Sequence, residues 1–220
     1  MFMSLTLADA AAQLKRTTPK YGWSNGLCPA VLLMTDRERL PSPIPALASL
    51  RRGNGVILRH YGDPSREALA RNIKDVCARL RLTFIVAEDW RLAAAVKADG
   101  LHLSDSRART GPPPGARLWL KHKRRLLTTA AHGPVSINRA AVLRADACLL
   151  APVFATKSHP GAHPIGPLRA GLMCRLARVT VLALGGITAH SVRSLRFLGI
   201  GGIAGIGFVQ EQEKVPRSPS

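Results

Sequence analysis

Acidic and aromatic side chains are scarce in this chain of 220 residues. Thirteen Asp and Glu residues stand against 32 Lys and Arg, which gives a formal net charge of +19, and aromatic residues make up only 5% of the sequence. So large a positive charge attracts polyanions, but binding of single-stranded nucleic acid also needs aromatic rings on which bases stack. The densest basic cluster, at residues 121–125, has almost no such rings around it. We expect a solvated loop there and no nucleic-acid partner, with a nucleic-acid-binding patch as the alternative.

Cysteine motifs and long apolar runs are absent as well. The four cysteines, at positions 28, 77, 148 and 174, form no CxxC pair and no Cys/His spacing typical of zinc, which indicates reduced thiols. No apolar run approaches the roughly 20 residues that span a bilayer. The first residues lack a basic segment ahead of their apolar part, and Asp9 interrupts that part, so we expect no secretory signal. These absences predict a cytoplasmic protein with no transmembrane segment.

Eight short apolar runs recur along the chain, at residues 30–34, 55–58, 83–86, 100–103, 126–131, 147–151, 180–184 and 202–206. Each is largely apolar rather than alternating, which is typical of strands covered on both faces in a parallel sheet. Several segments between them, at residues 65–80, 90–98 and 167–178, have the apolar spacing of helices. This order predicts an α/β protein with a single domain, a (β/α)₈ TIM barrel. An open doubly wound sheet is the alternative, but no GxGxxG motif follows the first run.

The first and last of these apolar runs set the expected boundaries of the barrel domain. We expect residues 28–209 to form the barrel, between an N-terminal extension at 1–27 and a C-terminal tail at 210–220. The tail leaves little room for an eighth helix, so the last helix is expected to be short or truncated. Residues 4–16 are expected to form a capping or dimer helix, and a membrane-surface helix is the alternative. A homo-oligomer is therefore left open.

Glycines follow the last two apolar runs, at the edge where barrel enzymes carry their chemistry. Gly185, Gly186 and Gly207 allow backbone N–H groups to approach an anion closely. Because many TIM barrels hold a phosphate between these two loops, the three glycines are the candidate phosphate site. The alternative is that they only turn the chain.

Several motifs together resemble the thiamine phosphate synthase/TenI family over about residues 30–209. They are TDR at 35–37, LR at 58–59, ADGLHL at 98–103, AAH at 130–132, APVFATKSHPGA at 151–162, ALGGI at 183–187 and GIGGIA at 199–204. The resemblance implies a TIM-barrel enzyme of thiamine biosynthesis that acts on a thiazole phosphate. Synthases of the family couple hydroxymethylpyrimidine diphosphate to hydroxyethylthiazole phosphate and release pyrophosphate. That reaction needs dense positive charge around the leaving group, supplied by Mg²⁺ together with Arg and Lys.

The diphosphate half of the family's site is only partly kept. Arg59 stands at the family's strand-two arginine, whereas Tyr61 replaces a lysine two residues later. Glu88 stands at one metal-binding aspartate and is the candidate metal ligand, but Arg107 stands at the second. Either Arg107 replaces the charge of the metal in a metal-independent synthase, or the diphosphate half of the site has decayed.

The loop after the sixth run gives the same mixed result. Thr156 is retained from the family's pattern, Ser158 replaces a threonine, and His159 falls where a diphosphate-binding lysine is expected. Lys157 is the substitute if the loop bends differently. The resemblance thus implies that Arg59 and these four loop residues contact substrate.

Loss of both a carboxylate and a lysine favours a TenI-like thiazole tautomerase, which shifts a proton and needs neither metal nor diphosphate. His132, at the position of the TenI catalytic histidine, is the candidate acid/base. The alternative is a histidine whose ring only satisfies backbone hydrogen bonds. His102 lies inside an apolar run and is expected to pack within the barrel. No cofactor is expected for a tautomerase, and Mg²⁺ is expected for a true synthase, which is the first alternative. A non-catalytic barrel that binds a phosphate ligand or nucleic acid is the second.

Overall fold

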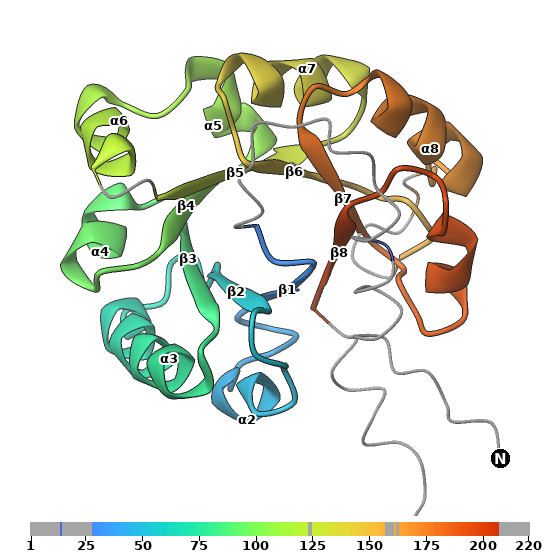
Figure 1. The fold of residues 1–220 in the computed structure, drawn as a ribbon. Coiled ribbons are helices and arrows are strands. Elements are labelled where there is room, and N and C mark those ends of the chain that lie inside the picture. The colour runs from blue at the N-terminus through green and yellow to red at the C-terminus, as the bar shows by residue number, and fades with distance from the viewer. Residues whose placement is uncertain (1–13, 15–27, 123–124, 157–160, 162, 207–220) are drawn as a thin grey trace, which may run out of the picture.

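The structure, a computed structural model, describes residues 14, 28–122, 125–156, 161 and 163–206. Eight parallel strands form a closed barrel in which each strand pairs with the next along the chain and β8 pairs with β1 (Figure 1). The strands are β1 Val31–Met34, β2 Gly55–Leu58, β3 Thr83–Ala87, β4 Gly100–Leu103, β5 Leu126–Ala131, β6 Ala147–Leu150, β7 Thr180–Leu184 and β8 Gly202–Gly205. The predicted TIM barrel is confirmed, and each expected strand agrees with the structure to within one residue at either end.

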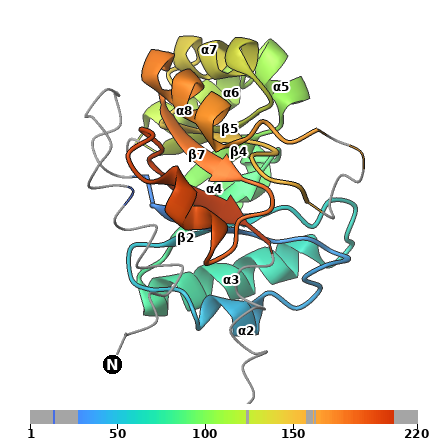
Figure 2. The ribbon, with the colours of Figure 1, turned by 90° about the vertical axis from the view of Figure 1, so that its right-hand side faces the viewer.

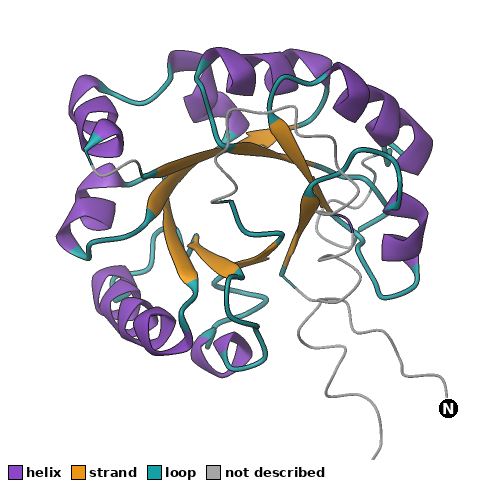
Figure 3. Cartoon of the chain, viewed as in Figure 1, coloured by secondary structure: helices purple, strands orange, loops and turns teal. Residues whose placement is uncertain are grey.

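Helices surround the strands on the outside of the barrel (Figure 3). They are α2 Ile44–Leu47, α3 Arg66–Leu80, α4 Trp90–Ala95, α5 Asp105–Thr110, α6 Pro114–Lys121, α7 Pro134–Val142, α8 Pro167–Leu176 and the 3₁₀ helix η1 Ser191–Leu195. Figure 2 shows α2 and α3 on one side of the barrel and α5, α7 and α8 on the opposite side. Two helices, α5 and α6, connect β4 to β5, and only η1 connects β7 to β8. No helix within the described part of the chain is both long and apolar enough to cross a membrane.

The strands bury nearly all of their side chains, as their uninterrupted apolar runs predict. Leu32, Ile57 and Ile85 have no exposed surface, and seven strands are buried along their whole length or all but one residue. Leu14 is 1% exposed and belongs to the same core cluster. The rest of the N-terminal extension, the C-terminal tail and the expected last helix lie outside the described residues.

Carboxylates stabilise the edge of the barrel at which the strands begin. Oδ2 of Asp99 accepts the backbone N–H of Phe84 at 2.8 Å, and Oδ2 of Asp146 accepts that of Leu127 at 2.8 Å. Such bonds at this edge serve stability, because the chemistry of TIM barrels lies at the opposite edge. At the end of the basic cluster, Arg125 donates to the carbonyl oxygen of Trp119 at 2.8 Å and stacks on its ring. This arginine therefore packs against α6 and is not a freely solvated loop residue.

Candidate functional site

Arg59 is held in place directly after β2 by a buried polar pair. The hydroxyl oxygen of Thr35, the residue after β1, accepts the backbone N–H of Arg59 at 3.0 Å. The same hydroxyl lies 2.8 Å from Nδ1 of His60, and Nε2 of His60 lies 3.4 Å from the carbonyl oxygen of Pro41. Because a carbonyl oxygen only accepts, Nε2 carries the ring proton and the Thr35 hydroxyl donates to Nδ1. Thr35 and His60 therefore fix the position from which the Arg59 side chain leaves the barrel wall.

Arg66 connects the ends of β2 and β3. Its Nε donates to the carbonyl oxygen of Arg59 at 3.0 Å, and its Nη2 donates to that of Ala87 at 2.6 Å. The ring of Tyr61 lies 5.7 Å from the Arg59 guanidinium and 5.6 Å from that of Arg66, within the range of cation–π attraction. Burial raises the pKa of Tyr61, although the two guanidinium charges oppose this shift. Arg59 is thus packed against Tyr61, the residue that the resemblance aligns with a lysine of the family.

Glu88 and Arg107, which the resemblance aligns with the family's metal-binding positions, form an ion pair. Oε2 of Glu88 lies 3.1 Å from Nε of Arg107, and its Oε1 accepts the backbone N–H of Ser104 at 2.6 Å. Both carboxylate oxygens are therefore occupied by N–H donors. Magnesium needs oxygen ligands, whereas the second ligand position carries a guanidinium that repels a cation. This donor set does not fit Mg²⁺, and the described residues contain no group of three or more His, Cys, Asp or Glu able to hold a metal.

His132 follows β5 and presents an exposed imidazole whose orientation is set by β6. Its Nδ1 lies 2.9 Å from the carbonyl oxygen of Ala151. Since that oxygen only accepts, Nδ1 carries a proton, and the lone pair of the neutral ring is on Nε2. The backbone N–H of His132 donates to the hydroxyl of Ser136 in the first turn of α7 at 2.8 Å. Hydrogen bonds thus hold both the backbone and the ring of His132, and Nε2 is the basic atom.

The glycine turn after β7 packs closely against the loop after β6. Gly185 and Gly186 have φ angles of +92° and +64°, which favour glycine. A Cβ atom at Gly186 would overlap the carbonyl oxygen of Ala155 and lie 2.8 Å from Cβ of Phe154. The N–H of Phe154 donates to the carbonyl oxygen of Gly185 at 3.1 Å. The methyl group of Thr156 lies 3.7 Å from where a Cβ of Gly185 would be, so the structure brings these two predicted site residues together.

Four predicted site residues cannot be placed. Lys157, Ser158, His159 and Gly207 lie outside the described residues. Their expected contacts with substrate and phosphate therefore stay predictions.

His102 is buried within the barrel, as the sequence predicts. Its Nδ1 lies 3.0 Å from the hydroxyl of Thr128 on the neighbouring strand. Burial lowers the pKa of His102 to about 3, and the positive charge of Arg59 acts in the same direction. The imidazole is therefore neutral near pH 7 and has no proton to give as a cationic acid.

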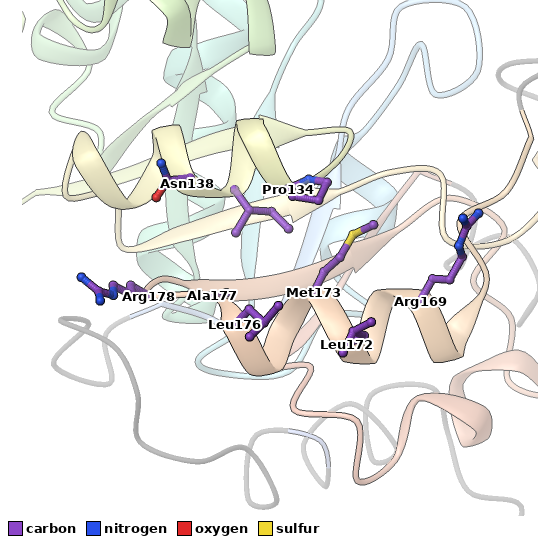
Figure 4. A pocket seen from close by; sticks show the side chains of 9 residues that line it. Pro134, Asn138, Arg169, Leu172, Met173, Leu176, Ala177 and Arg178 are labelled. Carbon is purple, nitrogen blue, oxygen red and sulfur yellow. The ribbon is translucent and has the colours of Figure 1, made fainter.

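An apolar groove of about 330 Å³ lies apart from these strand-end residues, on the outer wall between α7 and α8 (Figure 4). Met173 of α8 points toward Pro134 of α7 within it. The exposed leucines Leu172 and Leu176 border the groove. None of the predicted site residues lines this groove, so its size does not make it the reaction site.

The Thr35–His60 pair and the Arg66 bridge were not predicted. The only signal for them was the position of the TDR and LRHY segments at strand ends, which gives no partner for either side chain. The hydrogen bonds join residues 24, 25 and 21 positions apart. The sequence does not show these hydrogen bonds, because they depend on which strands lie side by side in the barrel.

Comparison with known proteins gives a consistent family. A family model described as thiamine monophosphate synthase matches residues 43–209. A thiamine-phosphate synthase of Lactococcus lactis is 26% identical over 166 residues, which cover 74% of this chain and 73% of that protein. One from Geobacillus thermodenitrificans is 30% identical over 151 residues, which cover 66% and 64% of the two chains.

Solved structures show that the fold is shared. The thiamine phosphate pyrophosphorylase of Pyrococcus furiosus superposes with a TM-score of 0.67 at 22% identity, over 84% of this chain and 87% of that one. A thiamine phosphate pyrophosphorylase of Bacteroides thetaiotaomicron superposes with a TM-score of 0.55 at 16% identity, over 87% and 89%. With a family model that spans three quarters of its length and a barrel of the same kind, the chain belongs to the thiamine phosphate synthase/TenI family of thiamine-biosynthesis enzymes.

Proposed function

We propose that this enzyme is a thiazole tautomerase of the TenI type, acting on a carboxythiazole phosphate with His132 as acid and base. The observation that carries the proposal is the hydrogen bond from Nδ1 of His132 to the carbonyl oxygen of Ala151. It leaves Nε2 as a basic lone pair on an exposed ring at the carboxyl end of a barrel strand. The Glu88–Arg107 ion pair adds support, because a proton shift needs no metal at that position.

The proposed reaction moves one proton and changes no other bond partners. Nε2 of His132 removes a proton from a carbon of the non-aromatic ring, and the bond electrons shift into the ring. The resulting imidazolium returns the proton to a second carbon, and the product ring is aromatic. The carbonyl of Ala151 stabilises the imidazolium through its bond to Nδ1–H, as a positioned acceptor does in general acid–base catalysis.

The substrate phosphate is proposed to bind at the turn formed by Gly185 and Gly186, with Gly207 completing the cradle. Supporting this placement, the Ser191 hydroxyl donates to the carbonyl oxygen of Gly186 at 3.2 Å, which fixes the turn beside the start of η1. Arg59 and Thr156 are proposed to contact the other end of the substrate, together with Lys157, Ser158 and His159. We place the enzyme in the cytoplasm, where a soluble phosphorylated intermediate would be met.

A true synthase is the second candidate function, favoured by the names of the relatives, which are thiamine-phosphate synthases. Arg59 and Arg66 would supply positive charge beside the leaving pyrophosphate. Since the Glu88–Arg107 pair does not fit a metal ion, such a synthase would have to release pyrophosphate without Mg²⁺ at that position.

Two parallel assays separate the candidates. The first follows loss of the non-aromatic carboxythiazole phosphate by proton NMR, and the second follows thiamine phosphate by chromatography from the pyrimidine diphosphate and thiazole phosphate, with Mg²⁺ or with EDTA. We expect the ring proton shift in the first assay and no thiamine phosphate in the second. Thiamine phosphate at a synthase's rate would overturn the proposal. A folded protein inactive in both assays would contradict both candidates and favour a ligand-binding barrel.

A further inference from the structure

We infer that the guanidinium of Arg107 takes the place of a divalent cation at the mouth of the barrel, so that this enzyme binds no Mg²⁺ there. This inference does not depend on which of the two reactions the enzyme performs. It concerns the identity of the positive charge beside Glu88, which follows from the contacts of that carboxylate.

Glu88 is oriented toward the guanidinium by its backbone and by Ser104. The residue follows β3 directly and has a φ angle of +67°, an uncommon conformation for a residue other than glycine. The N–H of Ser104 then holds Oε1 at 2.6 Å, and Oε2 faces Nε of Arg107 at 3.1 Å. A cation bound by Glu88 would have to displace Arg107 or lie beside its positive charge.

Three further carboxylates at this mouth are paired with arginines too. The pairs are Asp36 with Arg59 at 3.9 Å, Asp89 with Arg66 at 3.9 Å and Asp105 with Arg139 at 2.6 Å. Each carboxylate follows β1, β3 or β4, and each partner is a guanidinium. A cation drawn to these three carboxylates would therefore meet oxygens whose charge is already balanced, as the charge of Glu88 is by Arg107.

The position of Arg107 makes a direct test feasible. It is the third residue of α5, whose N-cap is Ser104, and its side chain is 70% exposed. An acidic residue is favoured in the first turn of a helix, and Ser-x-x-Asp can form a capping box. Arg107→Asp is therefore compatible with the fold, and it gives back the second carboxylate that the family places there.

The matched control is Arg169→Asp. Arg169 is the third residue of α8 and is exposed. Its replacement by aspartate changes the net charge by the same amount as Arg107→Asp does. The sequence from residue 147 to residue 206 contains no Asp or Glu. A carboxylate at position 169 therefore has no acidic neighbour from that stretch with which to bind a cation.

Binding of Mn²⁺ alone, measured by electron paramagnetic resonance of the free ion, is the readout. We expect Arg107→Asp to bind Mn²⁺ at this site, and the unmodified enzyme and Arg169→Asp to bind it at least tenfold more weakly or not measurably. Adding Glu88→Gln to Arg107→Asp should abolish that gain. Arg107→Ala serves as a second variant, and its Glu88 should bind Mn²⁺ less tightly than the two carboxylates of Arg107→Asp.

Mn²⁺ binding by the unmodified enzyme that Glu88→Gln removes would overturn the inference. So would equal Mn²⁺ binding by folded Arg107→Asp and Arg169→Asp. Neither outcome depends on turnover, so failure of the tautomerase proposal would be seen separately in the NMR assay.

Discussion

The hydroxyl oxygen of Thr35 accepts the backbone N–H of Arg59 at 3.0 Å, across the boundary between β1 and β2. This bond continues the inter-strand ladder one residue beyond the sheet, with a side chain in place of a backbone carbonyl. The Arg59 backbone is consequently fixed from β1 by Thr35 and from α3 by Arg66. The one arginine that the family resemblance retains from strand two therefore sits on a rigid support.

Replacing Thr35 by valine should destabilise the protein by about 1–3 kcal/mol, because the buried N–H of Arg59 and Nδ1 of His60 would both lose a partner. Thr129→Val is the matched control. Thr129 is also fully buried, and its hydroxyl has no hydrogen-bond partner among the described residues, so its removal should leave stability unchanged or raise it. Urea unfolding of both variants measures the difference. Equal effects of the two substitutions would contradict the assigned role of Thr35.

Replacing Gly186 by alanine should displace the loop after β6, since the added methyl group would overlap the backbone of Ala155. We expect a loss of about 2 kcal/mol or more in stability and at least tenfold weaker binding of a thiazole phosphate, measured by calorimetry. Gly62→Ala has a similar φ angle of +69° but open space around its Cβ position. It should cost only about 1 kcal/mol and leave binding intact. A Gly186→Ala variant that resembles Gly62→Ala would show that the close contact is unimportant.

His132→Ala should lower the rate of the ring proton shift by about 10²–10⁴-fold, the usual contribution of a positioned acid/base. Binding of the substrate phosphate should stay within about twofold, because His132 is not part of the proposed glycine cradle. The rate comes from the NMR assay and the affinity from calorimetry. His122→Ala, at an exposed position after α6, is the control and should keep full activity. Full activity in His132→Ala would refute the assignment of this histidine.

Burial of His102 should make folding stability fall between about pH 6.5 and pH 3. In the unfolded chain its pKa is near 6.5, whereas in the folded protein burial holds it at about 3, so acid protonates only the unfolded state in this range. The loss should reach on the order of 3 kcal/mol at pH 4. His102→Gln should lack this component, so its stability relative to the unmodified protein should improve as the pH falls. Parallel stability curves for the two proteins in urea titrations would contradict the shift.

The strands could be located from the sequence because barrel strands lie between helices and a packed interior, so their apolar runs are unbroken. The glycine turn and His132 were singled out for a related reason, since chemistry in this fold gathers where strands end, and their roles in binding and catalysis stay predictions. The helix between β7 and β8 was harder to predict from the sequence. It is a short 3₁₀ helix whose start is held by the reciprocal bonds of Thr188 and Ser191.

Partners of the site residues could not be predicted in the same way. The resemblance identified Glu88 and Arg107 as replacements, but their ion pair depends on the adjacency of β3 and β4 and on the backbone of Ser104. Likewise, the sequence offers His132 as a base without indicating its tautomer. That property comes from the carbonyl of Ala151, which the β5–β6 register brings within 2.9 Å.

The contact of Gly186 with Ala155 also has a consequence for transplanting parts of this barrel into a relative. Because the two turns fit one another backbone to backbone, we expect residues 151–156 and 183–188 to be exchangeable only as a pair. A chimera that receives both segments should keep its fold and its ligand. In a chimera that receives only one segment, the two turns should no longer fit against each other. For the same reason, a change in one of these loops during evolution would require a compensating change in the other.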